Sequence, residues 1–310
     1  MSASILTQSH PAPVHLVRWV ASIRDQLKPP VGNKLLNGDG CEFKVMVVAG
    51  PNTRTDYHLE DGEEWFYMVE GDMCLRVVDG GVFRDVVIRE GESFMLPGNI
   101  PHSPQRLANT IGLVIERERD QTEIDHLRWY CPQCREIVHE GTFHCVDLGS
   151  QLKPVIEGYY ASTESRTCSK CGTLDLHPSQ RTPPAADPAG AAKKPGHNSI
   201  NPDTHPNPFN LRQAIEAKGI APGSSAFLYG PESQFHLKAS RGPSTSVEFK
   251  AAANETWFYQ LSGSCTVNVQ VADKTESVQV DEGQCYLLPR GISHAVQRSA
   301  DSLGLVLSRP

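Results

Sequence analysis

Three side chains that can bind a transition metal occur next to two strand-like runs of the chain. His58 and Glu64 lie on either side of a short acidic turn, and Glu64 opens the run 65–69. His102 directly follows the apolar run 94–101. Two neutral imidazoles and one carboxylate are the ligand set of a mononuclear non-heme Fe(II) site with open coordination positions. Two hairpins would bring all three side chains inside one small barrel. The alternative is a barrel in which these polar residues only satisfy one another.

Two arginines and a glutamate near these ligands suit an anionic substrate. Arg54 stands four positions before His58, and Arg106 stands four positions after His102. If both intervals are strands, side chains four apart share a face, so both guanidinium groups would point into the barrel. There they could hold a carboxylate. Glu116, at the end of an apolar run, could accept a proton or a hydrogen bond inside. The alternative is that these three charges are exposed at the barrel end.

Two Cys-x-x-Cys pairs predict a second metal site, at Cys131, Cys134, Cys168 and Cys171. Four thiolates at this spacing favour a closed tetrahedral site for a structural Zn or a rubredoxin-like Fe. A redox-active dithiol pair is the alternative. The nine cysteines are an odd number, which suits a metal knuckle in a reducing compartment better than a disulfide framework.

The chain carries an internal repeat at an offset of 192 residues. The sequence Trp-Phe-Tyr occurs at 65–67 and again at 257–259, and Gly-Leu-Val occurs at 112–114 and again at 304–306. The same register extends back to two predicted helices, around 14–27 and 209–218, where Ile23 aligns with Ile215. The repeat therefore predicts two barrels, each preceded by a helix.

The second copy keeps only part of the predicted site. His102 and Arg106 recur, as His294 and Arg298. Four other positions change: His58 to Lys250, Glu64 to Thr256, Arg54 to Ser246 and Glu116 to Ser308. Lysine with threonine cannot hold a transition metal in this geometry. We therefore predict a catalytic domain over 1–177 with the cysteine knuckle at 131–171, a proline-rich linker over 178–208 and a degenerate second barrel over 209–310.

The composition is that of an ordinary globular protein, with 39% apolar and 21% charged residues and a net charge of −7. The mild acidity and the lack of a dense basic block argue against a nucleic-acid partner. No apolar run reaches the length of a membrane-spanning helix. The first residues lack a basic region followed by an apolar core, so we do not expect a signal peptide. We therefore predict a cytoplasmic location.

The spacing of the predicted ligands resembles the cupin superfamily, which has a double-sheet jelly-roll architecture. Within it, several segments look like 3-hydroxyanthranilate 3,4-dioxygenase: Gly-Asn-Lys-Leu-Leu (32–36), Gly-Pro-Asn-x-Arg-x-Asp-Tyr-His (50–58), Glu-Glu-Trp-Phe-Tyr (63–67), Leu-Pro-Gly-Asn-Ile-Pro-His-Ser-Pro-Gln-Arg (96–106) and Gly-Leu-Val-Ile-Glu-Arg (112–117). The resemblance covers about 14–177 closely, with the cysteine knuckles of the bacterial and fungal forms. The second half resembles the degenerate cupin of the animal enzymes.

The resemblance implies an Fe(II)- and O2-dependent cleavage of the 3-hydroxyanthranilate ring. The product, 2-amino-3-carboxymuconate semialdehyde, closes to quinolinate on the route to NAD. The family's iron ligands fall on His58, Glu64 and His102. Its substrate-binding residues fall on Arg54, Arg106 and Glu116, and Asn33 is expected to border the pocket. The alternatives are a cupin dioxygenase for another aromatic acid, a non-catalytic metal-binding cupin, and a Zn-dependent isomerase. Single-cupin members pair as dimers, so we predict a monomer in which the second barrel replaces the partner.

Overall fold

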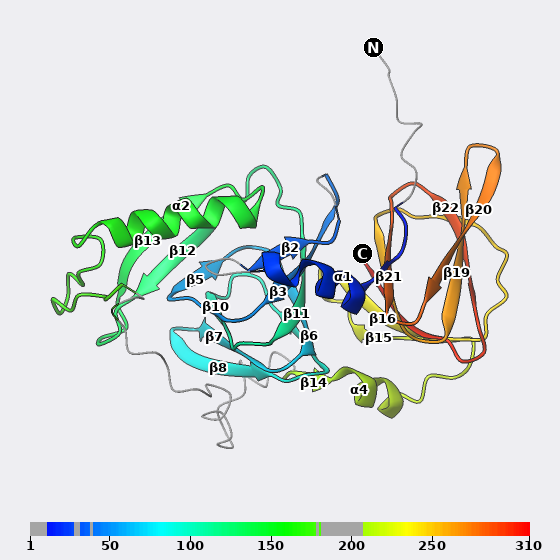
Figure 1. The fold of residues 1–310 in the computed structure, drawn as a ribbon, viewed down its shortest axis with the longest axis horizontal. Helices are drawn as coiled ribbons and strands as arrows, with labels where there is room; N and C mark the ends of the chain where they lie inside the picture. The colour runs from blue at the N-terminus through cyan, green and yellow to red at the C-terminus, as the bar shows by residue number, and fades with distance from the viewer. Residues whose placement is uncertain (1–10, 28–31, 38–39, 178–179, 181–206) are drawn as a thin grey trace, which may run out of the picture. The chain divides into compact units, whose positions relative to one another are not determined.

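The computed structural model describes residues 11–27, 32–37, 40–177, 180 and 207–310. The chain divides into two compact units, each built around a β-barrel (Figure 1). The unit called the first barrel comprises Arg24–Leu36 and Phe43–Leu211. The unit called the second barrel comprises Met1–Ile23, Asn37–Glu42 and Arg212–Pro310. Strands dominate both units, as predicted.

Two antiparallel sheets form the first barrel. One has the strand order β13-β12-β5-β10-β7-β8, with β4 also paired to β10. Its strands are β4 (Asn52–Thr53), β5 (Asp56–Leu59), β7 (Met73–Asp79), β8 (Val82–Ile88), β10 (His102–Arg106), β12 (Asp125–Tyr130) and β13 (Ile137–Phe143). The other has the order β14-β9-β6-β11-β3-β2. Its strands are β2 (Asn33–Leu35), β3 (Phe43–Ala49), β6 (Glu64–Glu70), β9 (Glu92–Leu96), β11 (Ile111–Arg117) and β14 (Phe209–Asn210).

Alternating side chains explain why these segments are strands that enclose a core. In β7, Leu75 and Val77 are fully buried, whereas Arg76 between them is exposed. This is the two-residue period of a strand with one face on the core. Burying a Leu or Val side chain completely contributes about 1.5–3 kcal/mol. The sum over the inner faces of both sheets holds the barrel closed around its polar site.

A helix that the sequence did not predict, α2 (Leu148–Ala161), lies beside β12 and β13 (Figure 1). It begins where Gln151 Oε1 accepts hydrogen bonds from the backbone N–H groups of Val146 and Asp147, at 2.6 and 2.7 Å. These bonds satisfy donors that a helix start leaves unpaired. Leu148 and Leu152 are buried in the core of the first barrel. The helix continues past Pro154. A short 3₁₀ turn, η1 (Arg24–Gln26), belongs to the same unit.

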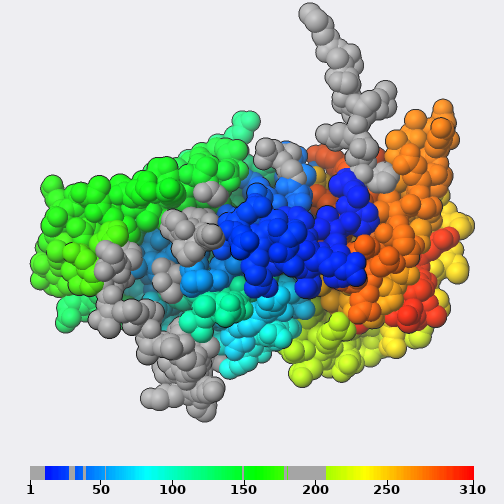
Figure 2. Space-filling view, in the orientation of Figure 1, coloured from blue at the N-terminus to red at the C-terminus, as the bar shows by residue number. Residues whose placement is uncertain are grey.

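Two sheets also form the second barrel, with the orders β1-β21-β18-β23-β16-β15 and β17-β22-β19-β20. Its strands are β1 (Val14–His15), β15 (Ser225–Tyr229), β16 (His236–Arg241), β17 (Lys250–Ala251), β18 (Thr256–Ser262), β19 (Ser264–Val271), β20 (Lys274–Asp281), β21 (Gln284–Leu288), β22 (Ser293–Arg298) and β23 (Leu303–Ser308). Its helices are α1 (Leu16–Ile23) and α4 (Leu211–Ala217), the second of which begins one residue before the unit boundary. The β19–β20 hairpin, orange in Figure 2, projects from this barrel.

The strands that precede the two helices correct the register of the repeat. Val14 pairs with Cys285, and Phe209 pairs with Ser93. Cys285 and Ser93 are 192 residues apart, but Val14 and Phe209 are 195 apart. The predicted match of Ile23 with Ile215 is therefore wrong by three residues, because the segment between helix and barrel differs in length.

The two compact units also differ from the predicted domains at the N-terminus. Residues up to Ile23 group with the second barrel, because β1 pairs with β21, whereas they were expected within 1–177. The predicted linker 178–208 lies outside the described residues except for 180, 207 and 208. Within the described part of the chain, no helix is long and apolar enough to span a membrane.

Candidate metal and substrate site

Both sheets of the first barrel contribute to the cluster of His58, Glu64 and His102. His58 on β5 stands directly opposite His102 on β10, and Glu64 on β6 stands opposite Glu116 on β11. One ligand atom from each of the three predicted metal ligands lies within 4.8 Å of the others, and all three are buried. His102 Nε2 is 2.8 Å from Glu64 Oε1, and His58 Nδ1 is 3.8 Å from the same oxygen. The structure thus brings together the set that the sequence singled out.

The outer nitrogen of each imidazole is held by the protein. His102 Nδ1 is 3.0 Å from the carbonyl oxygen of Ile100, and His58 Nε2 is 2.7 Å from Asp125 Oδ2. Such partners fix the tautomer and ring orientation of a metal-binding histidine and increase its basicity. They leave His102 Nε2 and His58 Nδ1 directed at Glu64. The arrangement therefore fits a metal ion held by two imidazoles and one carboxylate.

The electrostatics favour the metal-binding protonation states of His58 and Glu64, whereas the pKa of His102 is raised, because the Glu64 carboxylate outweighs the opposite effect of burial. Burial lowers the pKa of His58, which favours the neutral imidazole. Burial alone would raise the pKa of Glu64, but the adjacent His102 lowers it well below its ordinary value. Metal ligands must be deprotonated, so a neutral imidazole and an ionised carboxylate are the required forms.

A small cavity of about 60 Å³ joins the cluster to the residues predicted to bind substrate. Arg54, Arg106, Glu116 and Asn33 all line it. Arg106 is 1% exposed, its Nε has no hydrogen-bond partner among the described residues, and none of their ion pairs includes it. Burial lowers its pKa to about 10, so the side chain stays cationic at neutral pH. A buried cation without an anion is unfavourable and is a natural place for an anionic ligand.

Arg54 reaches the cavity by a different route from the predicted one. It lies between β4 and β5 and not within a continuous strand from 54 to 58, because β5 begins at Asp56. Its Nε donates to Asp56 Oδ2 at 3.0 Å, and Nη2 also contacts that carboxylate. Asp56 therefore holds the guanidinium at the cavity wall. Asn33, on β2, places its Nδ2 4.0 Å from Met46 Sδ.

A buried ionic network lies behind the cluster, and the sequence did not predict it. Arg119 forms ion pairs with three carboxylates, those of Glu60, Glu116 and Asp125. The Arg119 Nη2 to Asp125 Oδ2 distance is 2.9 Å, and Asp125 in turn contacts His58. Arg119 therefore links the cavity-lining acid Glu116 to Asp125, which contacts His58.

The network also sets the charges of its carboxylates. Burial raises the pKa of Glu116 to about 7, and Arg119 acts in the opposite direction. Burial also disfavours the ionised form of Asp125, but hydrogen bonds from His58 and Arg119 lower its pKa to about 2. Asp125 is therefore an anion that can hold the His58 N–H.

The four knuckle cysteines converge at the β12–β13 hairpin. Cys131 Sγ is 3.5 Å from Cys171 Sγ, and Cys134 Sγ is 3.6 Å from Cys168 Sγ. Metal–sulfur bonds of 2.3 Å in a tetrahedron place sulfurs about 3.8 Å apart, so these spacings fit one shared ion. Among the described residues, the other His, Cys, Asp and Glu groups able to hold a metal are the triad and a group of Glu60, Glu64 and Glu116.

Comparison with known proteins decides the family. A model of 3-hydroxyanthranilic acid dioxygenase matches residues 9–160 and 221–310. The 3-hydroxyanthranilate 3,4-dioxygenase of Rattus norvegicus is 37% identical over 303 residues, which cover 96% of each chain. This chain belongs to the 3-hydroxyanthranilic acid dioxygenase family. The predicted resemblance and enzyme class are thereby confirmed.

Shorter microbial proteins and a solved structure complete the comparison of this dioxygenase family member. The 3-hydroxyanthranilate 3,4-dioxygenase of Scheffersomyces stipitis is 53% identical over 165 residues, covering 53% of this chain and 96% of its own. That of Xanthomonas euvesicatoria is 52% identical over 166 residues, covering 54% and 92%. A cupin 2 conserved barrel domain protein from Leptotrichia buccalis matches 99% of this chain and 100% of its own, at a TM-score of 0.52 and 12% identity. That likeness confirms the cupin fold.

Proposed function

We propose that this protein is an Fe(II)-dependent dioxygenase that cleaves 3-hydroxyanthranilate with O2 to 2-amino-3-carboxymuconate semialdehyde. Membership of the dioxygenase family supports the reaction class. One structural observation supports the site most directly: His58, Glu64 and His102 share a buried cavity with Arg106, a cation that lacks an anionic partner. A metal site beside an unpaired buried cation suits a substrate that carries both chelating groups and a carboxylate.

The chain's own side chains would bind and orient the ring. Fe(II) held by the His58–Glu64–His102 cluster would supply a Lewis-acid centre with open positions for an ortho-aminophenol and for O2. Arg54 and Arg106 would hold the ring carboxylate, and each charged hydrogen bond contributes about 1.5–3 kcal/mol. Glu116 would accept a hydrogen bond from the amino or hydroxyl group and take up the proton released when the substrate binds.

The walls of the cavity would keep water from the reacting ring. Phe66, Val114, Leu148 and Leu152 line it beside the polar groups. A water-excluded site strengthens the electrostatic interactions of Arg106 and Glu116 with the substrate. Arg119 is a positioning residue in this scheme, because it holds Glu116 from one side and Asp125 from the other.

Further parts of the proposal concern the second metal, the assembly and the location. A structural Zn or Fe at Cys131, Cys134, Cys168 and Cys171 would join the β12–β13 hairpin to the segment after α2. The monomeric state, with the second barrel in place of a partner subunit, stays a prediction, and a sedimentation mass near twice the chain mass would contradict it. A cytoplasmic location also stays a prediction.

Oxygen uptake and product absorbance, followed together, test the proposed reaction. The protein is loaded with Fe(II) without oxygen, and O2 and 3-hydroxyanthranilate are then added. We expect one O2 consumed per substrate and a transient near-ultraviolet chromophore of the semialdehyde, both lost in His58→Ala. Turnover only of hydroxybenzoates without an amino group would instead favour another aromatic acid. No uptake with any aromatic acid at a filled iron site would favour a non-catalytic cupin.

A further inference from the structure

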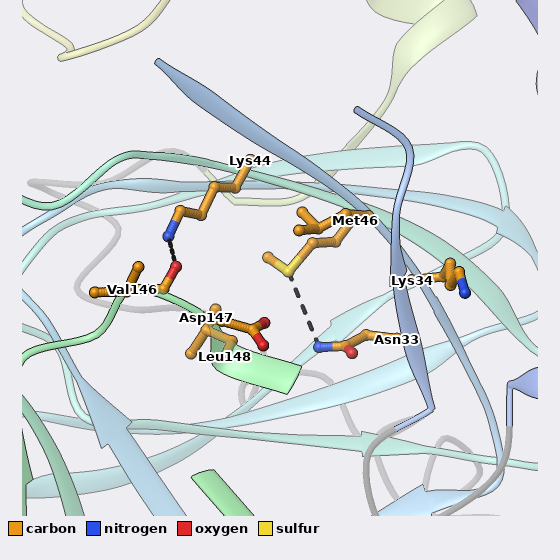
Figure 3. A pocket seen from close by; sticks show the side chains of 8 residues that line it. Asn33, Lys34, Lys44, Met46, Val146, Asp147 and Leu148 are labelled. Atoms are coloured by element: carbon orange, nitrogen blue, oxygen red, sulfur yellow. Dashed lines mark hydrogen bonds between the residues drawn. The ribbon is translucent and has the colours of Figure 1, made fainter. Parts of the chain in front are cut away.

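A second, larger pocket adjoins the cavity that holds the metal cluster. It has a volume of about 260 Å³ and lies between β2, β3 and the start of α2 (Figure 3). Three residues line both spaces: Asn33, Met46 and Leu148. The outer pocket is therefore continuous with the wall of the inner cavity and belongs to the same unit.

The inner cavity alone is too small for the proposed substrate. Its volume is about 60 Å³, whereas an engineered cavity that takes up benzene measures about 150 Å³. A substituted single ring therefore needs more space than the inner cavity offers. The outer pocket supplies that space on the side where Asn33, Met46 and Leu148 form the shared wall.

Lys44 places a positive charge in the outer pocket. It lies on β3 directly opposite Glu116 on β11, and Lys44 and Met46 both line the pocket. Its Nζ donates a hydrogen bond to the carbonyl oxygen of Val146, just before α2 (Figure 3). A backbone carbonyl is a neutral acceptor, so the charge of the ammonium group is available to an anion.

The other charged residues that line the pocket have hydrogen-bond partners of their own. Lys34 Nζ donates to Gln26 Oε1 at 3.2 Å, and its side chain points away from the rest of the group in Figure 3. Asp147 Oδ2 accepts a hydrogen bond from Ser150 Oγ at 2.5 Å, at the start of α2. Lys44 is thus the pocket-lining cation whose hydrogen bond crosses the pocket from β3 to the opposite wall.

We propose that the outer pocket is a binding subsite for a monocyclic aromatic carboxylate, with Lys44 as the group that first binds its carboxylate. The ring then spans the shared Asn33–Met46–Leu148 wall, so that its carboxylate passes from Lys44 to Arg106 in the inner cavity while part of the ring stays in the outer pocket. This inference rests on the proposed function for its ligand class. Lys44 acts on the rate of association and makes no contact with the reacting atoms.

Stopped-flow binding of anthranilate to the Fe(II)-loaded protein without oxygen tests the subsite. Anthranilate has the ring and the carboxylate but lacks the hydroxyl group that cleavage requires, and its own fluorescence reports binding. We expect Lys44→Gln to lower the association rate constant roughly three- to tenfold at low ionic strength. The difference should vanish at about 1 M salt, where the Debye length is about 3 Å.

Two further variants separate charge from packing. Lys44→Arg keeps the charge and a donor for Val146, so it should restore the rate, and Lys34→Gln is the matched control that should bind at the unaltered rate. Equal rates for Lys44→Gln and Lys34→Gln would overturn the proposal, as would equal slowing by Gln and Arg at position 44. Absence of anthranilate binding to the unaltered protein would overturn it too. Lys44-dependent binding without cleavage of 3-hydroxyanthranilate would contradict only the proposed function.

Discussion

The two barrels have the same strand pairing at the equivalent positions but differ in the side chains that those positions carry. His58 stands opposite His102 in the first barrel, and Lys250 stands opposite His294 in the second. In the same way Glu64 faces Glu116, and the equivalent pair in the second barrel is Thr256 with Ser308. The strand register is therefore identical at every ligand position. What separates a candidate metal site from an ordinary barrel is the chemistry of a few side chains.

Packing residues explain why the register survives the loss of ligands. Trp65 stacks on Tyr67 with ring centroids 6.0 Å apart, and Trp257 stacks on Tyr259 at 5.7 Å. The turns are also kept, because Gly71 has φ +66° and its equivalent Gly263 has φ +59°, values that favour glycine. The Lys250 side chain is 71% exposed, so the vacated ligand position has turned to solvent. Barrel formation and metal binding thus depend on different residues.

Glu64→Thr, which copies the second barrel into the first, should have the largest effect. Thr256 occupies the same position in a folded barrel, so we expect the fold to persist while Fe(II) binding is lost. The loss of several kcal/mol of stabilisation by the metal lowers turnover by at least about a thousandfold. Iron content measures Fe(II) binding, oxygen uptake measures turnover, and circular dichroism measures whether the fold persists. Glu63→Thr is the control, and wild-type iron content in Glu64→Thr would refute the ligand assignment.

Arg119→Gln should remove the cation that the ionic network of the first barrel requires. Three buried carboxylates would lose their shared partner, and breaking a buried ion pair destabilises by about 3–5 kcal/mol. Denaturant unfolding measures the change. Arg24→Gln is the control, because Arg24 pairs with Glu70 at the surface, where the two side chains are 46% and 37% exposed, and such a pair contributes only about 0–1 kcal/mol. Equal losses in the two variants would contradict a special role for Arg119.

Arg106→Gln and Arg298→Gln compare one retained residue in the two barrels. Arg298 Nη1, like Arg106 Nε, is buried without a hydrogen-bond partner among the described residues. Only Arg106 adjoins the metal cluster. Loss of a charged hydrogen bond of about 1.5–3 kcal/mol should lower kcat/KM roughly 10- to 150-fold in Arg106→Gln alone. Steady-state kinetics measure kcat/KM in both variants. An equal loss of kcat/KM in Arg298→Gln would contradict a substrate-binding role for Arg106.

Asp125→Asn probes a strand that differs between the barrels. β5 lies between β10 and β12, whereas in the described residues β17 pairs only with β22. β12 supplies Asp125, which holds His58. Loss of its charge should weaken Fe(II) binding about 10- to 100-fold, as measured by competition with a chelator. Glu140→Gln, on the neighbouring strand and paired with Arg128, should leave affinity unchanged. Unchanged affinity in Asp125→Asn would show that Asp125 does not support His58.

The barrels and the ligand triad could be predicted because their signals are local. Alternating apolar residues indicate strands, and His and Glu at the strand ends indicate ligands. Arg119 gave no such signal, since the run Glu-Arg-Glu-Arg-Asp at 116–120 is typical of a solvated surface, and Asp125 ends the largely polar segment 121–125 that follows. Their burial depends on the long-range pairing of β12 with β5, in which Leu127 lies opposite His58. The two-residue strand β1 and the helix α2 with its internal Pro154 likewise form through tertiary contacts.

Electron paramagnetic resonance of the nitric oxide adduct of Fe(II) tests the central claim most directly. Nitric oxide reports a non-heme Fe(II) that has an open coordination position. We predict one such iron per chain, a signal altered by adding 3-hydroxyanthranilate, and complete loss of the signal in Glu64→Thr but not in Arg298→Gln. A signal that persists in Glu64→Thr would contradict the assignment of the metal to the first barrel.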